Sequence, residues 1–276
     1  MATAELRIGV PVERKLTARL QSLSTSSRAN PVILATFRDR TSEAQLDQMR
    51  SDFVANASHE LRTPLASLKG FIETLQGPAK DDPNARAQFL DIMQQEASRM
   101  SRLINDLLSL SRIEMRVHVP PLERVDLSAV VREESELIGP TANRAGQTIV
   151  MSVPEDATTI RGERDELVQV VQNLVQNAIK YGKQGGAVSI RLSPAGNNVS
   201  LAVADDGIGI AKEHLPRLTE RFYRVSAKDS RERGGTGLGL AIVKHIVNRH
   251  RGQMDITSAL GRGTTVTVSF AMEPTT

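Results

Sequence analysis

The sequence predicts an α+β protein, with a pair of long helices followed by a mixed α/β sandwich. From residue 42 to residue 110, apolar side chains recur at spacings of three and four, which is typical of long amphipathic helices. Later in the chain, short apolar runs occur as adjacent pairs with short connections, which favours a mixed or antiparallel sheet. The 276 residues, of which 39% are hydrophobic, suffice for roughly two domains with packed cores.

Composition excludes several function classes. The 35 Lys and Arg residues nearly balance the 32 Asp and Glu residues and form no basic block, so we expect no nucleic-acid partner. The chain has no cysteine, which excludes disulfides, thiolate zinc sites and cysteine nucleophiles. No apolar run approaches the roughly 20 residues that cross a bilayer, and the N-terminus lacks a signal-peptide pattern. We therefore expect a soluble protein or fragment.

Residues 1–40 are predicted to be β-rich. Two runs have strand character, Arg14–Leu23 and Pro31–Arg38, and the polar segment Ser24–Asn30 between them is typical of a turn. Because two strands alone are marginally stable, we expect these residues to be the end of a larger domain.

Residues 41–117 are predicted to form a helical hairpin. The first helix starts near Ser42 and stops at Gly77-Pro78, and Asp82-Pro83 are a suitable N-cap and first turn for the second. A hairpin cannot bury its apolar stripe alone, so we expect a homodimer that forms a four-helix bundle. A monomeric hairpin packed on its own second domain is the alternative.

Val117–Pro121 is predicted to be a linker, and residues 118–276 a separate domain. We expect helices there at 126–139, 163–181 and 237–251. We expect strands at 147–153, 187–193, 198–204, 253–258 and 263–270.

His59 is the first candidate for chemistry. It lies two residues from both Ala57 and Leu61, which places it on the helix face opposite the apolar stripe. Glu60 is adjacent, and a carboxylate that holds one ring nitrogen makes the other more nucleophilic. Pro64 cannot donate to the carbonyl of Glu60, so we expect the helix to bend or loosen there. Alternatively, His59 is a surface residue beside a tolerated kink.

Three later segments are candidates for a nucleotide site. Asn173, Asn177, Lys180 and Tyr181 share one helix face, where an amide oxygen suits Mg²⁺ and a lysine suits phosphate. Asp205-Asp206-Gly207-Ile208-Gly209-Ile210 follows an apolar strand, and a carboxylate there can accept a hydrogen bond from an adenine amine. The alternatives are a solvated helix face and a plain turn.

The third segment is Gly234–Leu240, a glycine-rich loop that precedes a helix. Glycine followed by a helix N-terminus is an anion site, because its N–H groups are free. The spacing is neither the Walker pattern nor the dinucleotide fingerprint. The polar segment Arg224–Arg233 before it has the composition of a mobile lid. An ordinary flexible loop is the alternative.

These segments together resemble the sensor histidine kinases. Ser58–Leu65 resembles their H-box, Asn173–Tyr181 their N-box, Asp205–Ile210 their G1 box, Glu220–Arg224 their F-box and Gly235–Gly239 their G2 box. Gly261–Thr264 resembles the final glycine box. The segments Arg217–Arg224 and Gly237–His245 are most similar to the phosphate-regulon sensor kinases, and the N-terminal strands resemble the tail of a PAS domain.

The resemblance implies a fold, a reaction and roles for residues. It implies a HisKA dimerisation hairpin followed by a GHKL α/β sandwich that binds ATP and Mg²⁺. His59 would accept the phosphoryl group, with Glu60 as general base, and pass it to an aspartate of a response regulator. Thr63 would position a water for dephosphorylating that regulator, and Asn177 would bind Mg²⁺. The implied nucleotide-binding residues are Asn173, Asn177, Lys180, Tyr181, Asp205, Gly207, Gly209, Arg224, Gly235, Thr236, Gly237, Leu238 and Gly239.

One departure from the family bears on the site. Asp206 stands where the family often has Asn, which adds a negative charge near the expected nucleotide. The resemblance also implies a cytoplasmic location, with the chain as the cytoplasmic portion of an inner-membrane sensor. One alternative is a GHKL ATPase or a serine kinase with the same pocket, but neither needs a His-Glu pair on a dimeric hairpin. The other is a non-catalytic dimeric scaffold, and the retention of every catalytic side chain argues against it.

Overall fold

The structure is a computed structural model that describes residues 2–9, 14–23, 32–226 and 234–273. The chain divides into two compact units, residues 1–67 and 68–276. The boundaries predicted at 40/41 and 117/118 rest on the change of sequence pattern and on the proline-containing linker, and they stay a prediction.

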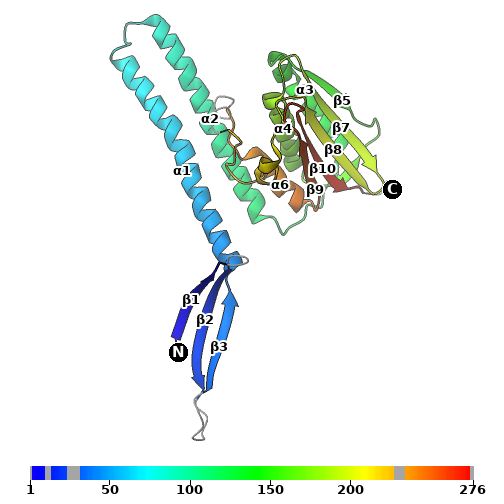
Figure 1. The fold of residues 1–276 in the computed structure, drawn as a ribbon. Helices are drawn as coiled ribbons and strands as arrows, with labels where there is room; N and C mark the ends of the chain where they lie inside the picture. Colours follow the sequence, from blue (N-terminus) through cyan, green and yellow to red (C-terminus); the bar gives the residue numbers. More distant parts are fainter. Residues whose placement is uncertain (1, 10–13, 24–31, 227–233, 274–276) are drawn as a thin grey trace. The chain divides into compact units, whose positions relative to one another are not determined.

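The first unit begins with a three-stranded antiparallel sheet in the order β1-β2-β3, formed by Ala2–Ile8, Arg14–Leu23 and Val32–Asp39 (Figure 1). Strands β2 and β3 are the two that the sequence predicts. Strand β1 was not predicted, because Ala, Glu and Arg outnumber its β-branched residues Thr3 and Ile8, and Ala and Glu are depleted in strands. The predicted turn at 24–30 lies outside the described residues.

One face of this sheet is apolar, and most of its large side chains are exposed. The pairing register places Leu6 opposite Leu16, and Ala4, Ala18 and Phe37 in one row across the three strands. Because side chains alternate between faces, these residues share one side of the sheet. Phe37 is 62% exposed.

Hydrogen bonds join the sheet to the first turn of α1 (Thr41–Gln76). The Asp39 carboxylate accepts from the Thr41 backbone N–H at 2.9 Å and from its hydroxyl at 2.6 Å, and these bonds lower the pKa of Asp39. The Thr41 hydroxyl oxygen accepts from the N–H of Lys15 in β2 at 2.9 Å. The side chain of Glu43 pairs with Arg40 at 2.7 Å. The helix therefore starts from a capped, fixed point on the sheet.

Helices α1 and α2 (Pro83–Met115) begin and end where the sequence predicts. The helix α1 stops one residue before Gly77, and Asp82 caps α2 by accepting from the N–H groups of Asn84 at 2.9 Å and Ala85 at 3.0 Å. Pro64 lies inside α1, which is continuous there.

The second unit is built on a mixed five-stranded sheet in the order β5-β7-β8-β10-β9. These strands are Thr148–Ser152, Ala187–Ala195, Asn198–Asp205, Thr264–Ala271 and Gln253–Ser258. Only β5 and β7 pair in parallel, so the predicted mixed sheet is confirmed. Three short elements were not predicted: β4 (Arg124–Asp126), β6 (Thr159–Arg161) and the 3₁₀ helix η1 (Lys212–Arg217).

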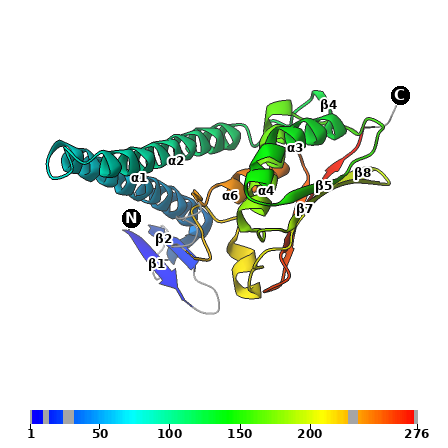
Figure 2. The ribbon, with the colours of Figure 1, turned by 90° about the horizontal axis from the view of Figure 1, so that it is seen from above.

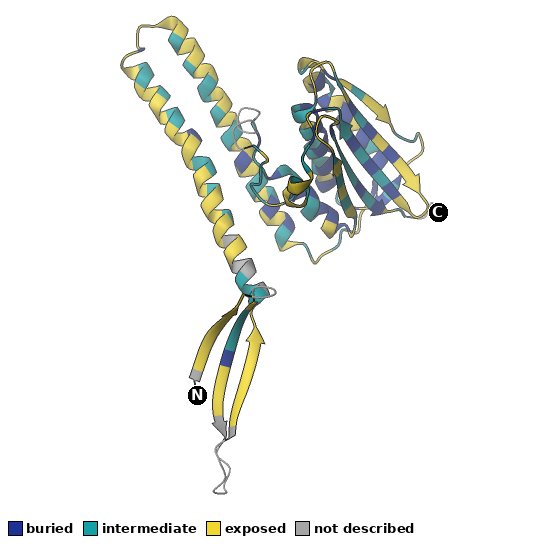
Figure 3. Cartoon of the chain, viewed as in Figure 1, coloured by how far each residue is buried: buried dark blue, intermediate teal, exposed yellow. Residues whose placement is uncertain are grey.

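Helices α3 (Leu127–Arg144), α4 (Arg164–Tyr181) and α6 (Gly239–Arg249) cover one face of this sheet (Figures 1 and 2). Alternate residues of β7 and β8, such as Ile190 and Leu201, are buried beneath them (Figure 3). The resulting α/β sandwich confirms the predicted fold. The C-terminal half of α2 packs on α6 and buries Leu103, Leu110 and Ile113. Among the helices of the described chain, none combines the length and apolarity that a bilayer requires.

Replacing Asp82 by alanine tests the cap of α2. The first turn loses the acceptor for two N–H groups, so we expect the free energy of unfolding to fall by about 1 kcal/mol and the melting temperature to fall by about 2–4 °C. Circular dichroism during heating measures this. The exposed neighbour Asp81, replaced in the same way, is the control, and an equal shift in both variants would contradict the capping role.

Candidate functional site

The predicted phosphoacceptor lies on the exposed face of α1. His59 is exposed and Glu60 is half-buried. The Thr63 hydroxyl donates to the backbone carbonyl of His59 at 3.2 Å, so it is one helical turn from the histidine. Pro64 is buried, on the side of the helix away from solvent. The imidazole is therefore open to a partner, as the sequence predicts.

The two predicted asparagines of α4 lie against the start of α6. A Cβ placed on Gly239 would stand 2.9 Å from Oδ1 of Asn173 and 3.7 Å from Nδ2 of Asn177. Segments that are more than sixty residues apart in sequence therefore meet here, and the missing side chain of Gly239 leaves room at the amides. The α6 N-cap residue, Leu238, makes no side-chain cap hydrogen bond, so the first turn presents N–H groups to an anion.

Asp205 ends β8 in a half-buried position. Burial raises the pKa of its carboxyl group, against the opposing effect of backbone hydrogen bonds from Gly207 and Thr264. The Gly207 N–H donates to Oδ1 of Asp205 at 2.8 Å. A Cβ on Gly207 would stand 2.0 Å from the carbonyl oxygen of Tyr181, so glycine is required for this loop to approach the end of α4.

Lys180 and Tyr181 end α4 beside that loop. The ammonium group of Lys180 lies 5.1 Å from the centre of the Tyr181 ring. Asp206, in contrast, turns toward the start of β7. Its carboxylate accepts from the N–H groups of Lys183 at 3.4 Å and Ala187 at 3.3 Å. The carboxylate that departs from the family pattern thus caps a strand.

The glycine-rich loop is joined to the F-box segment before it. The Phe222 N–H donates to the carbonyl of Gly237 at 2.8 Å, and both residues have positive φ, 63° and 74°. Arg224 donates through Nη2 to the carbonyl of Thr236 at 3.0 Å. Gly235 and Leu238 are buried and anchor the loop. Part of the predicted lid, residues 227–233, lies outside the described residues.

Two acidic residues of α2 that the sequence analysis missed contact this region. The Thr236 hydroxyl donates to Oδ2 of Asp106 at 2.7 Å, and Glu114 pairs with Arg221 of the F-box. A signal for Asp106 was present, because it shares the apolar stripe of Leu103 and Leu110 at spacings of three and four. A charged residue on a buried stripe needs a partner from elsewhere in the fold.

The donor set fits Mg²⁺ held partly by phosphate. In the part of the chain that the structure describes, no cluster of three or more His, Cys, Asp or Glu side chains could hold a metal ion. Asn177 offers an amide beside the α6 N-terminus, and Mg²⁺ commonly combines few protein ligands with substrate phosphates and water.

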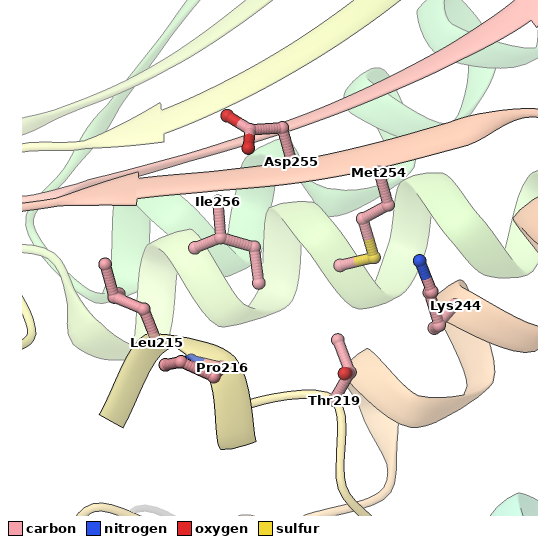
Figure 4. Close-up of a pocket in the computed structure, with 7 residues that line it drawn as sticks. All are labelled: Leu215, Pro216, Thr219, Lys244, Met254, Asp255 and Ile256. Atoms are coloured by element: carbon pink, nitrogen blue, oxygen red, sulfur yellow. The ribbon is translucent and has the colours of Figure 1, made fainter. Parts of the chain in front are cut away.

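A separate hollow of about 270 Å³ lies between η1, α6 and the edge strand β9 (Figure 4). Residues that line it include Leu215, Lys244 and Met254. The lining residues include none of the predicted nucleotide residues, so this hollow is distinct from the candidate site.

Two parts of the chain match known protein families. Residues 49–116 match the His Kinase A (phospho-acceptor) domain. Residues 162–274 match the histidine kinase-, DNA gyrase B- and HSP90-like ATPase family. The chain belongs to the sensor histidine kinases. The ATPase domain carries the candidate nucleotide residues, and the phosphoacceptor domain carries His59.

Relatives support this assignment. The chain is 40% identical over 269 residues to the phosphate regulon sensor protein PhoR of Pseudomonas aeruginosa, which covers 96% of the chain and 59% of that relative. The solved histidine kinase AdeS of Acinetobacter baumannii aligns with 78% of the chain and 98% of its own, with 26% identity and a TM-score of 0.61. The histidine kinase ThkA, solved in complex with the response regulator protein TrrA, shares the fold over 99% of the chain and 78% of its own, at 20% identity and a TM-score of 0.63.

Nucleotide affinity should depend on pH through Asp205. Only the ionised carboxylate keeps its full capacity to accept from an adenine amine, and burial raises the pKa of this group. As the pH falls from neutrality, Asp205 therefore takes up a proton earlier than an ordinary aspartate, whose pKa is about 3.9. We expect ATP affinity to fall over that range, measured by calorimetry.

The Asp205→Asn variant is the control, because its side chain does not titrate. It should bind ATP more weakly at neutral pH and retain only the pH dependence of the nucleotide itself. Identical pH profiles for the two proteins would contradict a role for Asp205 in nucleotide binding.

Proposed function

We propose that this chain uses ATP to phosphorylate His59 and then passes the phosphoryl group to an aspartate of a response regulator. The observation that carries the proposal is the meeting of Asn173 and Asn177 with the glycine-rich start of α6, which supports a site there for a nucleotide's phosphates. The exposed imidazole of His59 provides the acceptor. The chain spans 59% of the length of PhoR, so the activity of the whole protein is part of this proposal.

The reaction has two phosphoryl transfers. A ring nitrogen of His59 forms a bond to the γ-phosphorus of ATP, and the bond from that phosphorus to the bridging oxygen breaks, which releases ADP. Glu60 accepts the proton of the other ring nitrogen as positive charge develops on the imidazole. In the second transfer, a carboxylate oxygen of the regulator's aspartate attacks the phosphorus. The phosphorus–nitrogen bond breaks, and the ring nitrogen of His59 keeps the electron pair of that bond.

The second unit supplies binding and orientation. The carboxylate of Asp205 recognises the adenine amine, and Lys180, Tyr181 and Arg224 lie near nucleotide or phosphate. Gly207, Gly209, Gly235, Gly237 and Gly239 allow close backbone approach. Mg²⁺, held by Asn177, supplies charge neutralisation on the phosphates when it is bound.

The chain is proposed to act as a homodimer with residues 41–117 as the dimerisation hairpin and 118–276 as the catalytic domain. Large apolar side chains remain exposed on both helices of a single chain. These are Met49, Val54, Leu65 and Ile72 of α1 and Leu90, Ile104 and Leu108 of α2. A second hairpin that completes a four-helix bundle would cover such a stripe.

Residues 1–40 are proposed to be the end of a PAS-like sensor domain. Their antiparallel strands and exposed apolar face support this, since a larger domain would cover that face. The regulator is proposed to dock near His59, because its aspartate must reach the imidazole; ThkA, which shares the fold, was solved in complex with a response regulator protein. Thr63, one turn from His59, is proposed to help dephosphorylate the regulator as well.

Ile72→Lys tests the homodimer. Ile72 is 42% exposed in the single chain, and a lysine in a bundle core would be desolvated without a partner. We expect light scattering to show a dimer for the wild type and a large fraction of monomer for this variant. The polar, exposed Gln76, replaced by lysine, is the matched control and should stay dimeric. A monomeric wild type would contradict the bundle.

Labelled ATP with Mg²⁺ tests the proposed function. The wild type should incorporate γ-phosphate label that is lost in acid, because a phosphorus–nitrogen bond is acid-labile, and His59→Ala should incorporate none. Acid-stable label, or label that persists in His59→Ala, would assign the chain to serine or threonine kinases. ATP hydrolysis without any label would favour a GHKL ATPase.

A further inference from the structure

The C-terminal half of α2 contacts the candidate nucleotide site through two acidic side chains. Oδ2 of Asp106 accepts a 2.7 Å hydrogen bond from the hydroxyl of Thr236, in the glycine-rich loop. Two helical turns further on, Glu114 pairs with Arg221 and lies 3.6 Å from Nε2 of His245. Both contacts reach segments that are joined to each other through the Phe222–Gly237 hydrogen bond.

The hydroxyl of Thr236 has a single proton, which here is donated to Asp106. Its oxygen also accepts from the N–H of Leu238 at 3.3 Å. Leu238 is the N-cap residue of α6, where a phosphate would bind. A phosphate oxygen that takes the Thr236 proton must therefore displace the carboxylate of Asp106, because one hydroxyl cannot donate fully to both.

We propose that α2 and ATP compete for the Thr236 hydroxyl, so that nucleotide binding releases the glycine-rich loop from α2 and the α2 contact weakens nucleotide binding. This inference rests on the proposed function and adds a regulation of the same site. Linkage makes the effect reciprocal: whatever holds α2 on the loop lowers ATP affinity by the same factor by which ATP loosens α2.

The surroundings of Asp106 stabilise its hydrogen bond with Thr236 when no nucleotide is present. Burial raises the pKa of Asp106, while the hydrogen bond from Thr236 and the charge of Arg102 act in the opposite direction. The Arg102 guanidinium lies beside Gly234, where a Cβ would stand 3.1 Å from one of its nitrogens. Asp106 is half-buried, and a partly desolvated carboxylate that loses its hydrogen-bond donor is destabilised, so the Asp106 side chain keeps its hydrogen bond from Thr236 until a stronger acceptor replaces it.

The pair of Glu114 and Arg221 acts on the same loop. Its side chains are 35% and 25% exposed, so the pair is partly shielded from solvent. Arg221 directly precedes Phe222, whose N–H holds Gly237. Movement of the glycine-rich loop away from α2 therefore also displaces Arg221. The Asp106–Thr236 hydrogen bond and the Glu114–Arg221 pair should break together.

Nucleotide titration of Asp106→Ala tests the proposal. Removal of the competing acceptor frees the Thr236 proton, so we expect the Kd for a non-hydrolysable ATP analogue with Mg²⁺ to fall by about 5-fold or more, as is typical of coupling between linked sites. Ser109→Ala is the matched control. It removes a different hydrogen bond from α2 to the catalytic domain, the 2.6 Å bond to Gln169, which does not touch the loop. Its Kd should equal that of the wild type.

A second pair of variants distinguishes the loss of the competing hydrogen bond from a general loosening of the contact between α2 and the catalytic domain. In a Thr236→Val background, where no hydroxyl is left to compete for, Asp106→Ala should change the Kd no further. The competition would be overturned if Asp106→Ala alone left the Kd unchanged or raised it. It would also be overturned if Asp106→Ala changed the Kd equally in the wild-type and Thr236→Val backgrounds. A wild type that fails to bind the analogue would instead overturn the proposed nucleotide site itself.

Release of α2 can be observed directly. The chain has no cysteine, so spin labels can be placed only at cysteines that replace the exposed residues Ser111 of α2 and Asn248 of α6. The label-to-label distance distribution should broaden or lengthen when the analogue is added to the otherwise wild-type chain, and Asp106→Ala should show part of that change without nucleotide. A distribution that the analogue leaves unchanged would overturn the proposal.

Discussion

The burial of α6 is the constraint on which the rest of the second unit depends. Leu238, Ile242 and Ile246 are fully buried, and the helix packs against α4, β9 and β10. A helix held on so many sides cannot shift without opening the core, because protein interiors are close-packed. Its N-terminus, where the glycine-rich loop meets the asparagines of α4, is therefore a fixed point, as the proposed phosphate site requires.

The C-terminal end of α6 binds the linker through which the chain enters the catalytic domain. Arg249 is 4% exposed and its Nη1 pairs with Glu163 at 2.8 Å and Glu166 at 2.6 Å. Its Nε donates to the carbonyl of Val119, in the linker after α2, at 3.1 Å. Removing one partner of a buried ion pair leaves an uncompensated charge, so this cluster holds the linker to the base of α4 and α6. One helix thus connects the proposed nucleotide site with the linker that enters the domain.

The sequence predicted the elements with strong periodicity and those bounded by Gly, Pro and Asp, which include both long helices and the five strands of the main sheet. It missed β4 and β6, because three residues are too few to show a period, and it missed η1, whose Pro216 is ordinarily a helix-breaking signal. The exposed position of His59 followed from helix geometry alone. The contacts of Asp106 with Thr236 could not be predicted, because they join residues 130 positions apart and depend on how α2 packs against α6. Asp206 appeared to belong to the nucleotide site by its position in the motif, but its side chain turns to the start of β7.

The most direct test of the account is to locate the phosphoryl group on the chain. After incubation with ATP and Mg²⁺, the protein can be digested and analysed by tandem mass spectrometry under neutral conditions, which preserve phosphohistidine. The account predicts that the peptide containing His59 carries the modification on the imidazole, and that Asn177→Ala strongly reduces it. Modification of a serine or threonine, or of a different histidine such as His245 or His250, would contradict the account.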